Sequence, residues 1–317
     1  MNKNSKNQMM MLGECMIELT QASEPGNFKQ SFAGDVFNTG IYIKRCLNQA
    51  CDVNFLSVIG EDAMSEQLTQ FMAEEQLSTN FLYRSRTEKM GLYVVNVDQD
   101  GERSFSYWRD NSAARQLLKF VNQELNQDAF TGISTVFFSG ISIAILPDED
   151  LAEFWAFIKR LKSSGCKVVF DPNYRPVLWS SPQAARDAFA IAYSLSDIVL
   201  PGVDDHKALY QQNSAEEVAS HLEAIGVEEI IIKNGEQGVL ISVNGERLAI
   251  DITPVEKVVD TTSAGDAFNG GYLSARHQGI SVKGSVLYGA EVAACVIGHR
   301  GAIVPKTSFR TEVSPLS

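Results

Sequence analysis

Short apolar runs of strand length alternate with helix-length segments along almost the whole chain of 317 residues. Parallel strands need a long crossover between them, usually a helix, so this alternation predicts a mostly parallel sheet covered by helices on both faces. The expected strands are 9–15, 53–59, 134–139, 167–171, 198–201 and 229–233. The expected helices are 36–47, 65–75, 148–162, 182–193, 215–225, 264–277 and 282–297.

Two segments interrupt the alternation, 16–32 and 91–109, and both have the pattern of short strands joined by turns. The second contains Asp98-Gln99-Asp100-Gly101 between two alternating runs, and Asp-Gly in that position favours a hairpin. We therefore expect one domain, residues 1–317, with a small β-sheet formed by these segments. An edge hairpin of the main sheet is the alternative.

Composition excludes several classes of protein. An apolar content of 44% is too high for a disordered chain, and no apolar run approaches the length of a membrane span. The polar start lacks the apolar core of a signal peptide, so a soluble cytoplasmic protein is expected. The net charge of −12 disfavours binding to nucleic acid or to anionic membranes.

Cysteine and histidine spacing gives no metal or disulfide signature. The five cysteines are scattered and form no C-x-x-C pair, and the four histidines show no spacing such as H-E-x-x-H. This pattern argues against a disulfide framework, a structural zinc site and histidine-based catalysis.

The segment 260–271, with the sequence D-T-T-S-A-G-D-A-F-N-G-G, carries the strongest chemical signal. It places hydroxyl and glycine residues where a loop becomes a helix, with Asp266 one turn inside. The free N–H groups of a helix start bind anions, and a carboxylate beside an anion site can deprotonate a hydroxyl during phosphoryl transfer. A capped helix start without catalytic function is the alternative.

The order Asp-Thr-Thr-x-Ala-Gly-Asp-x-Phe followed by Gly-Gly resembles the C-terminal signature of the ribokinase-like (PfkB-type) carbohydrate kinases. The resemblance implies a three-layer αβα sandwich with a mostly parallel central sheet and a small β-sheet lid. It also implies that Asp266 is the catalytic base. The backbone of Ser263, Ala264 and Gly265 would form the anion hole for the γ-phosphate of ATP.

The chain has no G-x-x-x-x-G-K-[ST] loop and no G-x-G-x-x-G fingerprint after its first strand. The run from Lys233 to Gly238 instead looks like the K-x-G-x-x-G stretch that lies along the nucleotide in this family, although a plain hairpin turn would look the same. The ATP contacts implied by the resemblance are Asn173, Arg175, Lys233, Gly235, Gly238, Ser263 and Gly265.

An N-terminal segment, Phe32 to Asn38, matches the place where this family binds its sugar through a Gly-Gly or Gly-Asp pair and an asparagine. Gly34, Asp35 and Asn38 match that pattern, whereas Ala33 replaces the first glycine. Without the family resemblance, Asp35 would be read as a helix N-cap.

The substrate class is indicated by pieces spread from residue 9 to residue 305, such as Gly13-Glu14-Cys15-Met16-Ile17-Glu18-Leu19, which resemble the 2-keto-3-deoxygluconate kinases of this family. Arginine forks suit a carboxylate, and phenol hydroxyls can bond sugar oxygens. The implied substrate contacts are Gly34, Asp35, Asn38, Tyr93, Tyr107, Arg109, Arg175 and Asp266. Salt bridges in an acidic protein are the alternative for the two arginines.

The metal motif departs from the family. Many members have N-x-x-E after a central strand, but here the stretch from Pro201 to Asp205 lacks both residues, and Asp205 is the candidate with a shorter reach. ATP with Mg²⁺ is expected, and a monovalent cation such as K⁺ is a further candidate.

Together these features predict ATP-dependent phosphorylation of the 6-hydroxyl of 2-keto-3-deoxygluconate by a homo-oligomer that assembles through its β-lid. A fructokinase or ribokinase acting on a neutral sugar is one alternative. A sugar-acid sensor without turnover is the other.

Overall fold

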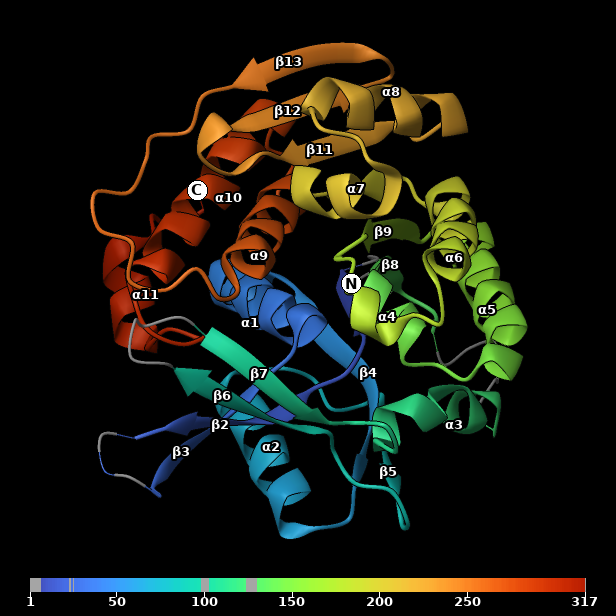
Figure 1. Cartoon of the computed structure of the whole chain (residues 1–317), viewed down its shortest axis with the longest axis vertical. Coiled ribbons are helices and arrows are strands. Elements are labelled where there is room, and N and C mark those ends of the chain that lie inside the picture. The colour runs from blue at the N-terminus through green and yellow to red at the C-terminus, as the bar shows by residue number, and fades with distance from the viewer. Residues whose placement is uncertain (1–6, 23, 25, 98–102, 124–129, 317) are drawn as a thin grey trace, which may run out of the picture.

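The protein is represented by a computed structural model that describes residues 7–22, 24, 26–97, 103–123 and 130–316. Each expected strand and helix has a counterpart in it (Figure 1). The strands are β1 (Gln8–Leu12), β2 (Met16–Gln21), β3 (Phe28–Ala33), β4 (Asp52–Gly60), β5 (Leu82–Ser85), β6 (Leu92–Val97), β7 (Arg103–Trp108), β8 (Ile133–Ser139), β9 (Lys167–Asp171), β10 (Ile198–Val199), β11 (Glu229–Lys233), β12 (Val239–Val243) and β13 (Glu246–Ile250). The helices are α1 (Asp35–Leu47), α2 (Ala63–Glu74), α3 (Leu117–Gln123), α4 (Gly140–Ala144), α5 (Leu151–Ser163), α6 (Pro182–Leu195), α7 (Val203–Tyr210), α8 (Ala215–Ile225), α9 (Ala264–His277), α10 (Val282–Ile297) and α11 (Lys306–Glu312).

The main sheet has nine strands in the order β13-β12-β11-β10-β9-β8-β1-β4-β5. Pairing is parallel from β11 to β5 and antiparallel at β12 and β13. The sequence reading missed these two edge strands. Asn244-Gly245, which joins them with positive φ at both residues, is the hairpin signal that would have found them.

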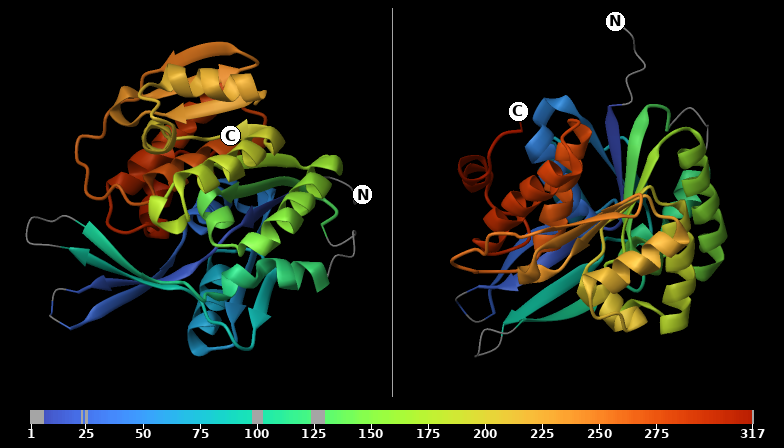
Figure 2. Two further views of the ribbon diagram at one scale, coloured as in Figure 1. Left: turned by 45° about the vertical axis from the view of Figure 1, so that its right-hand side comes forward. Right: turned by 90° about the horizontal axis from the view of Figure 1, so that it is seen from above.

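Helices cover both faces of this sheet, as the view from above in Figure 2 shows. Strand side chains point alternately to opposite faces, so Met9 and Met11 of β1 pack in one apolar cluster with α1, α2, α9 and α10. Met10 and Leu12 pack in the other, with α3, α5, α6 and α8. The expected three-layer α/β architecture is thus confirmed. No helix in the described part of the chain is long and apolar enough to cross a membrane.

The segments 16–32 and 91–109 form a separate four-stranded sheet in the order β3-β2-β6-β7, which projects beside the main sheet (Figures 1 and 2). Strands β2 and β6 pair in parallel, and the outer pairs are antiparallel. A small separate sheet was expected, and the alternative of an edge hairpin in the main sheet is wrong. The expected turn at 98–101 lies outside the described residues.

Close approaches of the backbone fix the edge of the main sheet where its parallel strands end. A Cβ atom on Gly34 would lie 2.2 Å from the carbonyl oxygen of Glu14, which follows β1. A Cβ atom on Gly140 would lie 1.9 Å from the carbonyl oxygen of Pro172, which follows β9. Glycine is therefore needed at both positions to bring these loops together.

We predict that Gly140→Ala lowers the free energy of unfolding by about 1–3 kcal/mol, because the clash is with backbone and no side-chain rotation relieves it. Gly298→Ala is the matched control, since its Cβ atom would meet nothing closer than 3.4 Å. Urea unfolding of both variants tests this. Equal stability of Gly140→Ala and wild type would contradict the packing argument.

Candidate active site

A cleft of about 1670 Å³ opens at the carboxyl ends of the parallel strands, next to the small sheet. Open α/β sheets bind ligands at this edge, where the chain order reverses, here between β1 and β8. The volume exceeds the roughly 300–1,000 Å³ of a pocket for one small ligand, so two ligands fit side by side. Every site residue expected from the sequence lines the cleft except Gly238.

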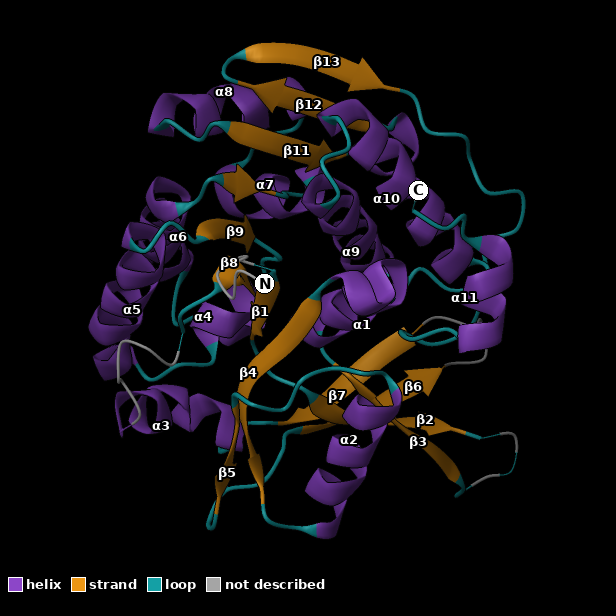
Figure 3. Cartoon of the chain, turned by 180° about the vertical axis from the view of Figure 1, so that it is seen from behind, coloured by secondary structure: helices purple, strands orange, loops and turns teal. Residues whose placement is uncertain are grey.

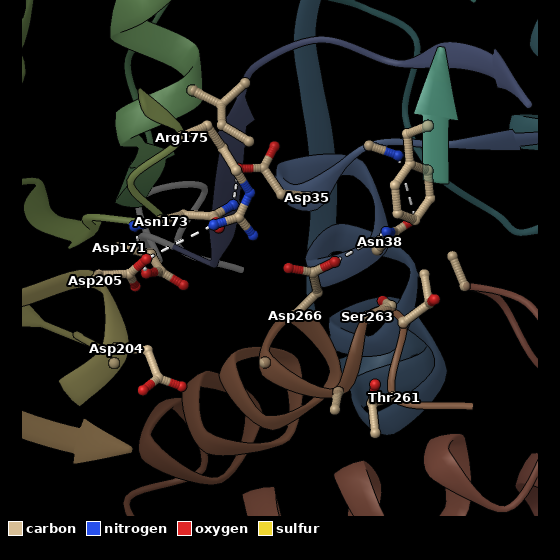
Figure 4. A pocket seen from close by; sticks show the side chains of 18 of the residues that line it. Asp35, Asn38, Asp171, Asn173, Arg175, Asp204, Asp205, Thr261, Ser263 and Asp266 are labelled. Carbon is tan, nitrogen blue, oxygen red and sulfur yellow. Dashed lines mark hydrogen bonds and ion pairs between the residues drawn. The ribbon is translucent and has the colours of Figure 1, made fainter. Parts of the chain in front are cut away.

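Asp266 lies in the first turn of α9, which begins at Ala264 as expected (Figure 4). The preceding residue, Ser263, has a left-handed backbone with φ of 66° and makes no side-chain capping bond to the helix. The N–H of Ala264 donates to the carbonyl of Thr261 at 3.2 Å, which closes the turn before the helix. The helix start therefore opens directly into the cleft, and its positive end faces the space beside Asp266.

The carboxylate of Asp266 is held by α1. The side-chain amide of Asn38 donates to its Oδ2 at 2.9 Å, and the Thr39 hydroxyl donates to its backbone carbonyl at 3.2 Å. Burial, aided by the negative charges of Asp35 and Asp171, raises the pKa of Asp266 to about 7, although the Asn38 bond opposes the shift. A carboxylate with this pKa accepts a proton far more readily than an ordinary aspartate near neutral pH.

Two further carboxylates in the cleft are also held by asparagine amides. Asn173 donates to Asp35 at 2.7 Å, and Asn269 donates to Asp171 at 2.5 Å. Asp35 is the first residue of α1, and the N-cap of this helix is Gly34. The alternative that Asp35 serves as the N-cap is therefore wrong. The neutral amides fix the carboxylates in place without adding a charge of their own.

Lys233, at the end of β11, supplies a positive charge to this region. Its ammonium group donates to the carboxylate of Asp171 at 3.0 Å and to the side-chain amide oxygen of Asn269 at 3.1 Å. The same ammonium lies 3.8 Å from the position that a Cβ atom on Gly265 would occupy. Lys233 thus lies beside the start of α9.

Asp171 and Asn269 were missed as site residues by the sequence reading. Asp171 is the last residue of a predicted parallel strand, which is a position where functional side chains gather and is the signal that could have found it. Gly238 packs against β13, because a Cβ atom there would lie 2.3 Å from the carbonyl oxygen of Ile250. Gly235 does line the cleft.

Asp205, the candidate metal ligand, lies in the first turn of α7 next to Asp204, and both line the cleft. Its carboxylate accepts the N–H of Tyr174 at 3.0 Å and lies 3.6 Å from the guanidinium of Arg175. Burial, together with the charge of Asp171, raises the pKa of Asp205 to about 6.

The other end of the cleft is built by the small sheet. The Tyr93 hydroxyl donates to Glu18, and the ring of Tyr93 lies 5.6 Å from that of Tyr107. Arg109 forms a buried ion pair with Glu14, and Glu14 was not expected as a site residue. The pairing leaves Arg109 Nε and Glu14 Oε1 buried without hydrogen-bond partners.

The salt-bridge alternative for the two arginines therefore describes a real contact in each case. Arg109 is 8% exposed and pairs inside the protein, whereas the side chain of Arg175 is 53% exposed and its pairing with Asp205 is long. Both still line the cleft, so neither contact excludes a ligand role.

Comparison with known proteins agrees with the fold. Residues 6–308 match the model of the pfkB family carbohydrate kinases. The 2-dehydro-3-deoxygluconokinase of Dickeya dadantii is 37% identical over 300 residues, which cover 93% of this chain and 96% of the relative. The enzyme of the same name from Escherichia coli K12 is 34% identical over 307 residues, which cover 95% of this chain and 98% of the relative.

Among solved structures, the fructokinase with bound ATP from Xylella fastidiosa superposes with a TM-score of 0.81. It is 23% identical and the match covers 96% of this chain and 95% of that one. At this identity the likeness establishes the fold. The family match, which spans nearly the whole chain, establishes more: the protein belongs to the pfkB family of carbohydrate kinases.

Proposed function

We propose that the protein is a 2-dehydro-3-deoxygluconokinase, which transfers the γ-phosphoryl group of ATP to the 6-hydroxyl of 2-keto-3-deoxy-D-gluconate. The single observation that carries the chemistry is the half-buried carboxylate of Asp266 in the first turn of α9, in a cleft large enough for two ligands. The substrate assignment is supported by relatives of that name at 34% and 37% identity over nearly the full chain.

In the proposed reaction Asp266 takes the proton of the 6-hydroxyl as that oxygen attacks the γ-phosphorus. The bond from the γ-phosphorus to the bridging oxygen of ATP breaks, and ADP leaves. Negative charge develops on the phosphoryl group as it is transferred. The backbone N–H groups of Ser263, Ala264 and Gly265 and the positive end of α9 would stabilise this charge. Lys233 adds a cation beside them.

ATP is proposed to lie along Lys233, Gly235, Asn173 and Arg175, with Gly238 shaping the turn. Carboxylate oxygens are the donors that Mg²⁺ prefers, and Asp204 and Asp205 present them at the wall of the cleft, so the donor set fits this ion. When bound, Mg²⁺ would offset the negative charge of the phosphates. A monovalent cation such as K⁺ is proposed as an activator, and the cytoplasm as the compartment.

Recognition of the sugar acid is assigned to Gly34, Asp35, Asn38 and the two tyrosines, with the arginines reading its carboxylate. Both arginines line the cleft, and a planar guanidinium can hold a carboxylate through two parallel hydrogen bonds. Glu14 holds the guanidinium of Arg109 in place. A neutral sugar offers no group of that charge.

We expect Asp266→Asn to lower kcat by about 10²–10⁴-fold, because an amide keeps the shape but accepts no proton. ATP affinity should stay unchanged, which equilibrium binding measures independently of turnover. A variant with near wild-type kcat on the sugar acid would show that Asp266 is not the base.

Arg109→Ala should lower kcat/KM on the sugar acid by about 10–150-fold and on fructose much less, since a charged hydrogen bond is worth roughly 1.5–3 kcal/mol. The single variant leaves Glu14 buried without its partner, so the double variant Glu14→Gln with Arg109→Ala is the control for folding. Arg109→Lys should fall between. An equal loss of kcat/KM on both substrates in the double variant would mean that Arg109 supports the structure of the lid and does not bind the substrate carboxylate.

The lid is proposed to join two subunits, because Phe28, Phe105 and Trp108 on the small sheet are 50%, 43% and 60% exposed. Large apolar surfaces of this kind are usually covered in solution. Light scattering should give a homo-oligomer, and Trp108→Glu should dissociate it. A monomeric wild-type protein, or an oligomer unaffected by the substitution, would contradict this assembly.

A further inference from the structure

A cluster of ligand-type side chains lies on α10 and α11, away from the cleft. Cys295 is in the last turn of α10, His299 follows the helix, and Glu312 ends α11. Within the described residues, their sulfur, imidazole nitrogen and carboxylate oxygen lie within 4.8 Å of one another. Spacing along the sequence did not reveal this group, because Glu312 comes from a different helix, which Figures 1 and 3 show beside α10.

The imidazole of His299 is oriented as a ligand. Its Nδ1 lies 2.9 Å from the backbone carbonyl of Cys295, and because a carbonyl only accepts, the proton must be on Nδ1. Nε2 then faces the carboxylate of Glu312, at 3.3 Å, where a metal ion could lie between the two ligand atoms. Metal-binding histidines are commonly fixed in this way, with one ring nitrogen donating to a backbone carbonyl.

The distance between the nitrogen and oxygen ligands of the group fits a tetrahedral ion. Zinc binds nitrogen and carboxylate oxygen at roughly 2.0–2.2 Å, so two such ligands of one tetrahedral ion lie about 3.3 Å apart. The distance between His299 Nε2 and Glu312 Oε1 has this value. The His299 and Glu312 side chains are 26% and 44% exposed, so an ion can enter and a water molecule can take the fourth position.

Nearby charge does not oppose a cation. Arg45, the cation that acts electrostatically on Cys295, makes two hydrogen bonds of 3.0 and 2.9 Å to the carboxylate of Glu75. Its positive charge is therefore largely offset. Glu312 then leaves the cluster with a negative charge that a divalent ion would neutralise.

We propose that Cys295, His299 and Glu312 form a zinc site. Thiolate and imidazole favour Zn²⁺ over Mg²⁺, so this site differs from one that would serve ATP. As the sulfur–zinc bond forms, the thiol proton passes to solvent. The ion would fasten α11 to the end of α10, where the carbonyl of Ile297 accepts the N–H groups of Val259 and Asp260 at 2.8 and 3.1 Å.

Through this contact the zinc site would also affect the segment that precedes α9. Asp260 begins the turn that leads into α9, and its carboxylate also accepts the N–H of Gly301 at 2.7 Å. Zinc at the end of α10 would therefore restrict the motion of Ile297 and Gly301, which hydrogen-bond to Asp260. The proposal concerns Cys295, His299 and Glu312 alone and stands whether or not the kinase assignment holds.

The test uses the full chain without a histidine tag. Calorimetric titration with ZnCl₂ should give one ion per chain, and Co²⁺ should produce the intense visible bands of a tetrahedral site with a thiolate charge-transfer band. Zinc should also raise the melting temperature, because it binds only the folded arrangement. Cys295→Ser and Glu312→Gln should each weaken zinc binding by at least about tenfold.

His277→Asn and Cys46→Ser are the matched controls, since neither residue belongs to the cluster. They should keep wild-type zinc affinity and the cobalt spectrum. Absence of stoichiometric zinc binding in the wild type would overturn the proposal. So would zinc binding that survives Cys295→Ser, or cobalt bands that are lost in Cys46→Ser and kept in Cys295→Ser.

Discussion

The carboxyl group of Asp266 is desolvated at the wall of the cleft and lies near the acidic side chains of Asp35 and Asp171, and this environment governs the chemistry of the cleft. Each of the three carboxylates is held by an asparagine amide, which fixes geometry without neutralising charge. Burial and like charge both favour the protonated form, so the pKa of Asp266 rises to about 7. A base of this strength is poised for proton transfer near neutral pH.

The fold maintains this arrangement through close helix packing. Asn38 reaches Asp266 because α1 and α9 approach without an intervening side chain at Gly270, where a Cβ atom would lie 2.6 Å from that of Tyr42. The close contact between these helices is visible from behind in Figure 3. The missing side chain at Gly270 thus lets α1 and α9 come close enough to position the carboxylate.

Local patterns predicted the architecture because each element carries its own signal. Apolar runs of strand length and segments of helix length located the parallel strands and their helices, and the loop-to-helix pattern placed Asp266 at the start of α9. The pairing of Glu14 with Arg109 could not be predicted, since it joins the end of β1 to the end of β7 and depends on how the two sheets meet. The same holds for the contact of Asp171 with Lys233, whose strands are separated by β10.

The sequence alone does not show whether an arginine near the sugar site is already paired with a carboxylate of the protein. An unpaired arginine near a sugar site would argue strongly for an acidic substrate, but Arg109 already has a carboxylate partner in Glu14. Its place in the lining of the cleft, and not its net charge, is therefore what supports a contact with a second anion. The substrate assignment rests on the relatives and the two arginines together.

The pH dependence of kcat/KM in wild type and Asp35→Asn tests the central claim most directly. With the base titrating near 7, activity should rise with pH through that value, because only the ionised carboxylate accepts the proton. Removal of the charge of Asp35 should shift this acidic limb to lower pH, whatever the loss in absolute rate. A limb that does not move, or activity independent of pH below 7, would contradict the assignment of Asp266 as a base tuned by its acidic neighbours.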